Sequence, residues 1–249
     1  MDAAETNIEI SVESLQGVRV AAEAGAARVE LCAGLSDGGL TPSAALIEAA
    51  AELIQVHVLV RPRPGDFAYA RDELDLIVRD IALARRHGAA GVVVGALTAE
   101  GAVHDACAAF VEAAGDLHTT FHRAIDVSAD SRRALDRLAA LGFTRVLTSG
   151  RRRSALDGAP LIRELAGRTA VAVMACGGVR AANAAAVLRA TGVRDLHAAP
   201  RRPAGAAAHL AQPGEVSYAG VGVPAGHDHF ETDAVEVAAL CAVREPYLG

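Results

Sequence analysis

Aromatic residues and cysteine are scarce in this sequence. Its 249 residues include no tryptophan, three tyrosines, five phenylalanines and four cysteines. The cysteines are widely spaced and form no Cys-x-x-Cys pair: Cys32, Cys107, Cys176 and Cys241. This spacing indicates neither a zinc knuckle nor a disulfide framework, so we expect reduced thiols.

Long apolar runs and a surplus of positive charge are also missing. No run reaches membrane-spanning length, and the first residues, MDAAETN, lack the basic end and apolar core of a signal peptide. The formal net charge is −6, whereas general binding to nucleic acid needs an excess of Lys and Arg on one face. We therefore expect a cytoplasmic protein with neither a membrane nor a nucleic acid as partner.

Small and branched apolar residues are abundant, at 52% for the apolar class as a whole. Short β-rich runs alternate with alanine-rich segments of helical length. The expected strands are residues 7–13, 28–33, 55–63, 91–97, 118–126, 145–150, 169–176 and 195–199. The expected helices are residues 14–24, 42–53, 71–87, 105–114, 130–141, 154–167, 181–190 and 233–244.

Strict alternation of strand and helix predicts parallel strands joined by crossovers, and eight such units close naturally into a barrel. The length also suits one barrel. We therefore predict an α/β fold, a single (β/α)₈ TIM barrel over residues 1–249, with a doubly wound open sheet as the alternative.

One segment, residues 200–232, is too long for an ordinary connection between a strand and a helix. It is rich in Gly, Ala and Pro, and we expect a long loop before the last helix, either a flap over the barrel mouth or a partly disordered segment. Its cluster of His227, Asp228 and His229 could bind a metal, but a polar loop tip is the favoured interpretation.

Polar side chains occupy alternate positions in the first three expected strands. Glu9 and Ser11 share one face of the first strand, Glu30 and Cys32 repeat the pattern in the second, and Arg61 lies near the end of the third. Since an ionised group inside a barrel is costly unless it is paired, we expect Glu9, Glu30 and Arg61 to neutralise one another. A purely structural network is the alternative to a catalytic one.

The fifth expected strand ends in TTFHRAID, residues 119–126. His122 and Asp126 are an even number of residues apart, so their side chains would lie on the same face of a strand. We therefore expect His122 near the barrel mouth with Asp126 above it. A histidine near a carboxylate can act as a general acid or base. The neighbouring Arg123 can hold an anion or pair with an acid on the next strand. A structural histidine is the alternative.

The last three expected strands end in LTSG, ACGGV and LHA. Gly177 and Gly178 precede a helix, so their backbone N–H groups could approach an anion there, although a tight turn explains them equally well. His197 provides a second candidate proton carrier.

Six segments resemble, in order, those of the copper homeostasis protein CutC family. They are VELCAGLSDGGLTPS (29–43), LVRPRPGDFAY (59–69), TFHRAID (120–126), VLTSG (146–150), ACGGV (175–179) and DLHA (195–198). The resemblance implies a cytoplasmic (β/α)₈ barrel with a role in copper homeostasis and copper ion binding. It also implies a polar mouth made of Glu9, Glu30, Arg61, His122, Arg123, Asp126, Ser149 and His197.

The sequence departs from the family at two sulfur positions. Family members often carry cysteine in the first strand and in the segment matching GDFAY, whereas this chain has Ser11 or Val12 and Ala68 there. Because Cu(I) prefers thiolate and thioether ligands, this departure weakens the inference of copper binding and leaves Cys32 as the candidate metal ligand.

Two functions therefore compete. One is a copper-binding protein that holds Cu(I) through Cys32. The other is an enzyme, an isomerase, lyase or hydrolase, acting on a small anionic metabolite. Arg61, Arg123, Ser149, His197 and the 177–178 turn would bind this metabolite, and Glu9, Glu30 and His122 would carry protons, with Asp126 orienting His122. A scaffold without chemistry is least favoured, and association into a homo-oligomer stays open.

Overall fold

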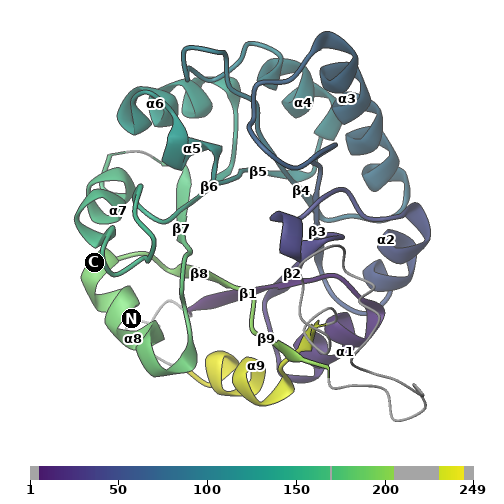
Figure 1. Ribbon diagram of the computed structural model, residues 1–249, viewed down its shortest axis with the longest axis vertical. Helices are drawn as coiled ribbons and strands as arrows, with labels where there is room; N and C mark the ends of the chain where they lie inside the picture. Colours follow the sequence, from purple (N-terminus) through teal and green to yellow (C-terminus); the bar gives the residue numbers. More distant parts are fainter. Residues whose placement is uncertain (1–5, 169, 205–229, 244–249) are drawn as a thin grey trace, which may run out of the picture.

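The centre of the molecule is a closed barrel of eight parallel strands (Figure 1). It is seen in a computed structural model that describes residues 6–168, 170–204 and 230–243. The strands are β1 (Asn7–Val12), β2 (Arg28–Leu31), β3 (Val56–Leu59), β4 (Gly91–Val94), β5 (His118–Phe121), β6 (Arg145–Thr148), β7 (Ala172–Ala175) and β8 (Asp195–Ala198). Each strand pairs with the next, and β1 also pairs with β8. The predicted TIM barrel is confirmed, and the open sheet was the wrong alternative.

An outer ring of helices surrounds the barrel (Figure 1). They are α1 (Leu15–Glu23), α2 (Ala44–Ala51), α3 (Arg71–Arg86), α4 (Cys107–Ala114), α5 (Ala124–Val127), α6 (Ser131–Leu141), α7 (Ala159–Ala166), α8 (Ala181–Thr191) and α9 (Ala234–Cys241). Several start at a residue whose side chain accepts hydrogen bonds from the first free N–H groups of the helix, namely Ser14, Ser43, Asp130 and Asp233.

The large apolar core lies between the strands and the helices. In β1, Ile8, Ile10 and Val12 belong to this core, whereas the alternating Glu9 and Ser11 are buried but lie outside it. Because side chains of a strand alternate between its two faces, the polar set of β1 points into the barrel. The interior of the barrel is therefore largely polar, and the helices supply the apolar burial that stabilises the fold.

The end of the fifth strand differs from the sequence prediction. β5 ends at Phe121, and the short helix α5 begins at Ala124, so Asp126 lies on a helical turn and not in a strand. The N–H of Asp126 donates to the carbonyl of Arg123, which closes this turn.

The long segment before the last helix begins and ends in a small antiparallel pair, β9 (Arg201–Pro203) with β10 (Phe230–Thr232). Its middle part lies outside the described residues, and so do His227, Asp228 and His229.

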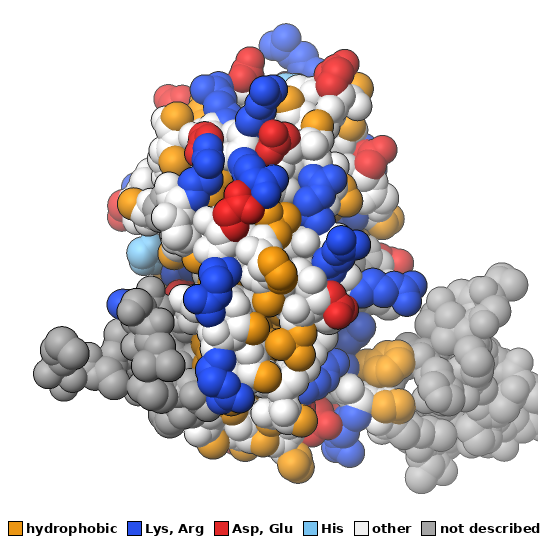
Figure 2. All heavy atoms as spheres, turned by 90° about the vertical axis from the view of Figure 1, so that its left-hand side faces the viewer, with side chains coloured by type: hydrophobic (Ala, Val, Ile, Leu, Met, Phe, Trp, Pro, Cys, Tyr) orange, Lys and Arg blue, Asp and Glu red, His pale blue; other side chains and the backbone are white. Residues whose placement is uncertain are grey.

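Arginines and acidic residues are interspersed on the face formed by α6, α7 and α8 (Figure 2). Arg132 pairs there with Glu164, and Arg168 pairs with Asp136. Such exposed pairs contribute little to stability because water screens them. Within the described residues, none of the helices combines the length and the apolar composition that crossing a membrane requires.

Candidate functional site

A cavity of about 350 Å³ lies at the carboxyl ends of the strands, where barrel enzymes carry their active sites. One part of its wall is charged or polar and includes Glu30, Arg61, His122, Arg123, Asp126 and His197. Another part is apolar and includes Leu35, Leu59, Phe67, Val127 and Leu147. The mixture of apolar surface with a few convergent polar groups is typical of a small-molecule site.

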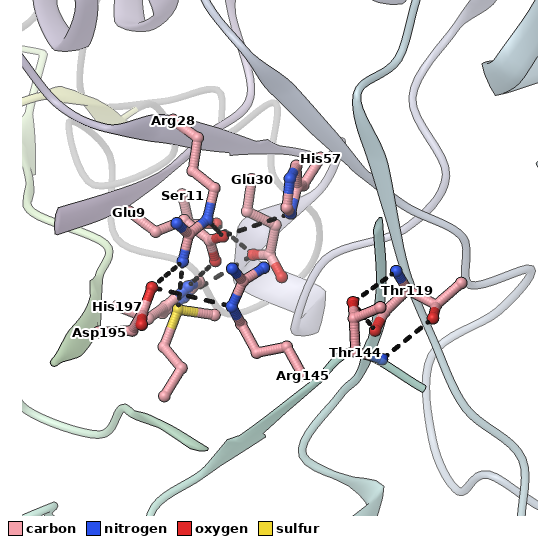
Figure 3. A network of polar contacts seen from close by, with 11 residues as sticks. Glu9, Ser11, Arg28, Glu30, His57, Thr119, Thr144, Arg145, Asp195 and His197 are labelled. Atoms are coloured by element: carbon pink, nitrogen blue, oxygen red, sulfur yellow. Dashed lines mark hydrogen bonds and ion pairs between the residues drawn. The ribbon is translucent and has the colours of Figure 1, made fainter. Parts of the chain in front are cut away.

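A buried ion-pair network lies beneath this cavity (Figure 3). Glu9 is completely buried; its Oε2 lies 2.6 Å from Nε of Arg28, and its Oε1 lies 2.8 Å from Nδ1 of His197. Nη2 of Arg28 in turn lies 2.7 Å from Oδ1 of Asp195. Arg28 and Asp195 were not among the residues proposed from the sequence. The sequence did contain a signal for Arg28, because it lies two positions before Glu30 in the same strand and its side chain is therefore on the same face.

Glu30 lies above this network, toward the cavity. Its Oε2 accepts a hydrogen bond of 2.8 Å from Oγ of Ser11 and lies 3.8 Å from Nε2 of His197. The imidazole of His197 therefore bridges Glu9 and Glu30. The structure thus brings together three of the residues proposed from the sequence, Glu9, Glu30 and His197.

The environments of Glu9 and Glu30 push their pKa values apart. Burial alone would raise the pKa of Glu9, but the hydrogen bond from His197 and the charge of Arg28 outweigh it and hold that pKa well below its usual range. Burial raises the pKa of Glu30, and Glu9 raises it further, against the opposing effects of His197 and Ser11. Burial would lower the pKa of His197, but Glu30 and Glu9 outweigh it and raise that pKa. Each of Glu30 and His197 therefore favours the charged form of the other.

Arg61 does not pair with these glutamates, so that expectation was wrong. Its Nη1 donates to the carbonyls of Asp37 and Gly39, both at 3.1 Å, and its Nη2 donates to the carbonyl of Gly65 at 2.9 Å. The physical reason is that Arg28 and His197 already neutralise the glutamates deeper in the barrel. Arg61 is only 7% exposed, its Nε has no hydrogen-bond partner, and no carboxylate of the described residues forms an ion pair with it.

His122 lies in the cavity wall and is 4% exposed. Its Nδ1 accepts a hydrogen bond of 3.3 Å from the N–H of Ala124, and its Nε2 has no partner among the described residues. The ring of Phe67 packs against the imidazole, with a distance of 4.6 Å between centroids. Burial, helped by the charge of Arg61, lowers the pKa of His122 to about 3, so the imidazole is neutral near pH 7.

Asp126 does not orient His122, which corrects the expected pairing. Its carboxylate accepts hydrogen bonds from Oγ1 of Thr148 at 2.6 Å, the N–H of Ser149 at 3.0 Å, the N–H of Arg151 at 3.1 Å and Nε of Arg123 at 3.1 Å. The turn of α5 causes this, because it directs the carboxylate toward the loop after β6. Arg123 also donates to Oγ of Ser149 at 2.8 Å, so Arg123, Asp126 and Ser149 form a separate cluster at the rim.

Gly177 and Gly178 are not brought to the cavity. Both adopt positive φ, 96° and 68°, as a tight turn before α8 requires. At the start of α8, the N–H of Ala181 donates to Oε1 of Glu236 at 2.7 Å, so a carboxylate of the protein already occupies this helix end.

Cys32 is completely buried between β1 and the cavity wall. Its Sγ donates to the carbonyl of Val12 and lies 3.8 Å from Oγ of Ser11. Burial raises the pKa of the Cys32 thiol far above its usual range, and Glu30 raises it further. In the described residues, one group of donors has metal-like spacing, Glu9, Glu30 and His197, whose ligand atoms lie within 4.8 Å of one another. This group offers oxygen and nitrogen but no sulfur, so it does not match the preference of Cu(I).

Comparison with known proteins gives a consistent picture. The sequence profile of the CutC family matches residues 6–201. A CutC family protein of Xanthomonas campestris is 45% identical over 213 residues, which cover 83% of this chain and 88% of that one. The mouse copper homeostasis protein cutC homolog is 40% identical over 199 residues, or 78% and 73% of the two chains. The crystal structure of CutC from Streptococcus agalactiae superposes with a TM-score of 0.73 at 32% identity, covering 77% of this chain and 97% of that chain.

Proposed function

The chain belongs to the CutC family, and from the charges at its barrel mouth we propose that it binds a small anionic metabolite there and catalyses a proton transfer on it. The observation that carries the proposal is Arg61, a buried guanidinium in the cavity wall with no carboxylate partner in the described residues. A buried cation without a counter-ion is costly. An anionic ligand in the cavity would supply the missing charge.

Glu30 and His197 support the proton-transfer part of the proposal. Both line the cavity, and Nε2 of His197 lies 3.8 Å from Oε2 of Glu30, so the charge of each affects the pKa of the other. Glu9 stays ionised, whereas the raised pKa of Glu30 brings it closer to the pH at which general acids and bases work best. Glu30 is therefore the proposed proton carrier. Glu9 and Arg28 are positioning residues that hold His197 beside it.

A hydrogen–deuterium exchange assay tests this function without knowledge of the complete reaction. The protein is incubated in D₂O with a panel of small phosphorylated and carboxylated carbonyl compounds, and loss of C–H signals is followed by NMR. We expect the wild type to catalyse exchange on at least one compound, and Glu30→Gln to lower the rate by about 100-fold or more. Glu112→Gln, an exposed change on α4, is the matched control. If no compound exchanges faster with wild type than with Glu30→Gln, the proposal is wrong.

Copper binding is the second candidate, supported by family membership and by the name of the mouse relative. The residues present fit Cu(I) poorly. The thiol of Cys32 would have to lose its proton in a place where burial raises its pKa, and Ser11 stands where a second sulfur would be needed. If the protein nevertheless holds Cu(I) as cargo through Cys32, chelator competition will show tight binding that Cys32→Ala removes. The four free thiols of the chain fit the proposal of a cytoplasmic, reducing location.

A further inference from the structure

We propose that His122 is a neutral hydrogen-bond donor to a carbonyl oxygen of the bound ligand, so that the substrate is a small carbonyl compound that also carries an anionic group. The inference rests on the proposed function and deepens it. It also replaces the role of proton carrier that the sequence alone indicated for His122.

The position of the proton on His122 follows from one hydrogen bond. A backbone N–H can only donate, and that of Ala124 points at Nδ1. Nδ1 must therefore carry a lone pair, which leaves the proton of the neutral ring on Nε2. Among the described residues, this Nε2–H group has no acceptor, although its side chain is buried in the cavity wall. Buried donors are normally satisfied, so an acceptor oxygen on the ligand is the missing partner.

The surroundings hold His122 in this donor state. Burial and the charge of Arg61 both disfavour the imidazolium, as its pKa of about 3 reflects. The rings of Phe67 and Phe121 pack against the imidazole, with centroid distances of 4.6 and 5.8 Å. Nε of Arg61 also lacks a hydrogen-bond partner in the part of the chain that the structure describes, and its guanidinium lies 5.3 Å from the same Phe67 ring. The cavity therefore has a charged donor for the anionic group and a neutral donor for a second oxygen.

The sequence limits how a carbonyl group could be activated here. All 24 of its basic residues other than histidine are arginine, and it contains no lysine. Activation through an imine with a lysine amine is therefore not open to this chain. A hydrogen bond to the carbonyl oxygen is the remaining way to activate the carbonyl group. A neutral imidazole is suited to this role because its N–H group can stabilise the negative charge that develops on the oxygen.

The proposed step balances without a further reactant. Glu30 in its ionised form takes the proton from the carbon next to the carbonyl group, and the C–H electron pair becomes the C=C bond of an enolate. The π electrons of the carbonyl move to its oxygen, where Nε2–H of His122 donates a hydrogen bond. Return of a proton to the same carbon restores the carbonyl group and gives exchange with solvent.

The state of His122 can be measured directly on the whole protein. In protein labelled with ¹⁵N in histidine, long-range ¹H–¹⁵N spectra distinguish the two tautomers and the imidazolium, and the His122 signals are assigned by their loss in His122→Gln. We expect the Nε2–H tautomer, unchanged from about pH 8 to about pH 5, where an ordinary histidine becomes charged. An imidazolium at pH 7, or a proton on Nδ1, would overturn the inference.

Binding of two probes then separates this inference from the proposed function. Oxalate, a planar dianion that resembles the enolate of a small oxo acid, and inorganic phosphate are titrated by calorimetry. We expect His122→Phe, which lacks a donor, to weaken oxalate binding by about tenfold. His122→Gln, which keeps an N–H donor, should stay close to wild type. Equal oxalate affinity in the Phe and Gln variants would overturn the role of His122, and so would failure of wild type to bind oxalate while it binds phosphate.

Phosphate reports on Arg61 in the same experiment. We expect its binding to fall far more in Arg61→Met than in His122→Phe. Absence of phosphate and oxalate binding to wild type would count against the anion site, and hence against the proposed function as a whole. The NMR measurement is made on the wild-type protein. It therefore depends on the folding of no variant except His122→Gln, which is used to assign the signals.

Discussion

Nη2 of Arg28 lies 2.7 Å from Oδ1 of Asp195, and this ion pair joins β2 to β8 across the strand between them, β1. The same guanidinium holds Glu9 of β1 through Nε. Three adjacent strands are thus tied together from inside the barrel, at the point where β1 and β8 close it. The network therefore supports both the closure of the barrel and the position of His197.

Replacing Arg28 with methionine should be strongly destabilising, because Glu9 and Asp195 would both lose the buried cation that they share. We expect a loss of about 3–5 kcal/mol in the free energy of unfolding, measured by urea denaturation at pH 7. Arg132→Met removes an exposed pair with Glu164 and serves as the matched control, with a much smaller loss. Similar losses in both variants would show that the buried network contributes no more to stability than an exposed ion pair does.

Acid should destabilise the protein through His57 and His122. Burial is the first cause that lowers the pKa of each to about 3, compared with 6.5 for an exposed histidine. Below pH 6.5 the unfolded chain binds protons that the folded protein excludes, so stability is lost as the pH falls. The loss approaches about 1.4 kcal/mol per pH unit for each histidine.

The measurement is urea unfolding at pH 7 and pH 5. We expect His57→Gln and His122→Gln each to lose less stability than wild type between these pH values. Gln55→Asn, an exposed change that removes no titratable group, should lose as much as wild type. A wild-type pH dependence in both test variants would mean that neither histidine is kept neutral by the fold.

Asp126→Asn tests the cluster at the rim. The carboxylate accepts from donors on all sides, among them Thr148, Ser149 and Arg151, and an amide would turn an N–H₂ group toward some of them. We expect a loss of about 1–3 kcal/mol in the free energy of unfolding. Asp116→Asn, at an 81% exposed side chain, is the control and should change little. No loss at Asp126 would contradict the described hydrogen bonds.

Ser11→Cys should convert a poor copper site into a better one. The Ser11 hydroxyl lies 3.8 Å from Sγ of Cys32, so a cysteine there would place two sulfur ligands side by side. We expect the affinity for Cu(I), measured by chelator competition, to rise by about tenfold or more, equivalent to about 1.4 kcal/mol. Ser11→Ala should leave it near wild type. If the wild-type protein already binds Cu(I) as tightly as the Ser11→Cys variant, the argument that missing sulfur ligands weaken copper binding is wrong.

The barrel and the inward set of polar residues were readable from the sequence because both follow from local periodicity. Glu9 and Ser11 alternate with Ile8 and Ile10, and that pattern alone predicts which side chains enter the barrel. The number of strands followed in the same way from the alternation of strands and helices.

The partners of the charged groups could not be read in this way. Arg61 binds carbonyl groups of residues 37 and 39, more than 20 positions earlier, which are turned toward it by glycines with positive φ. The tautomer of His122 depends on a turn that begins two residues later and that looked like a continued strand. Such contacts depend on how loops fold back over the mouth, and residue types at fixed spacing do not encode them.

The antiparallel pair of β9 and β10 has a consequence for how this protein can be altered. Pro203 is paired with Phe230, so the chain leaves the barrel and returns to it at neighbouring points. The cost of closing a loop grows slowly with its length, by about 0.6 kcal/mol for each doubling. The β9–β10 pair already holds these two points together, so the number of residues between them is not fixed by a distance that the chain has to span.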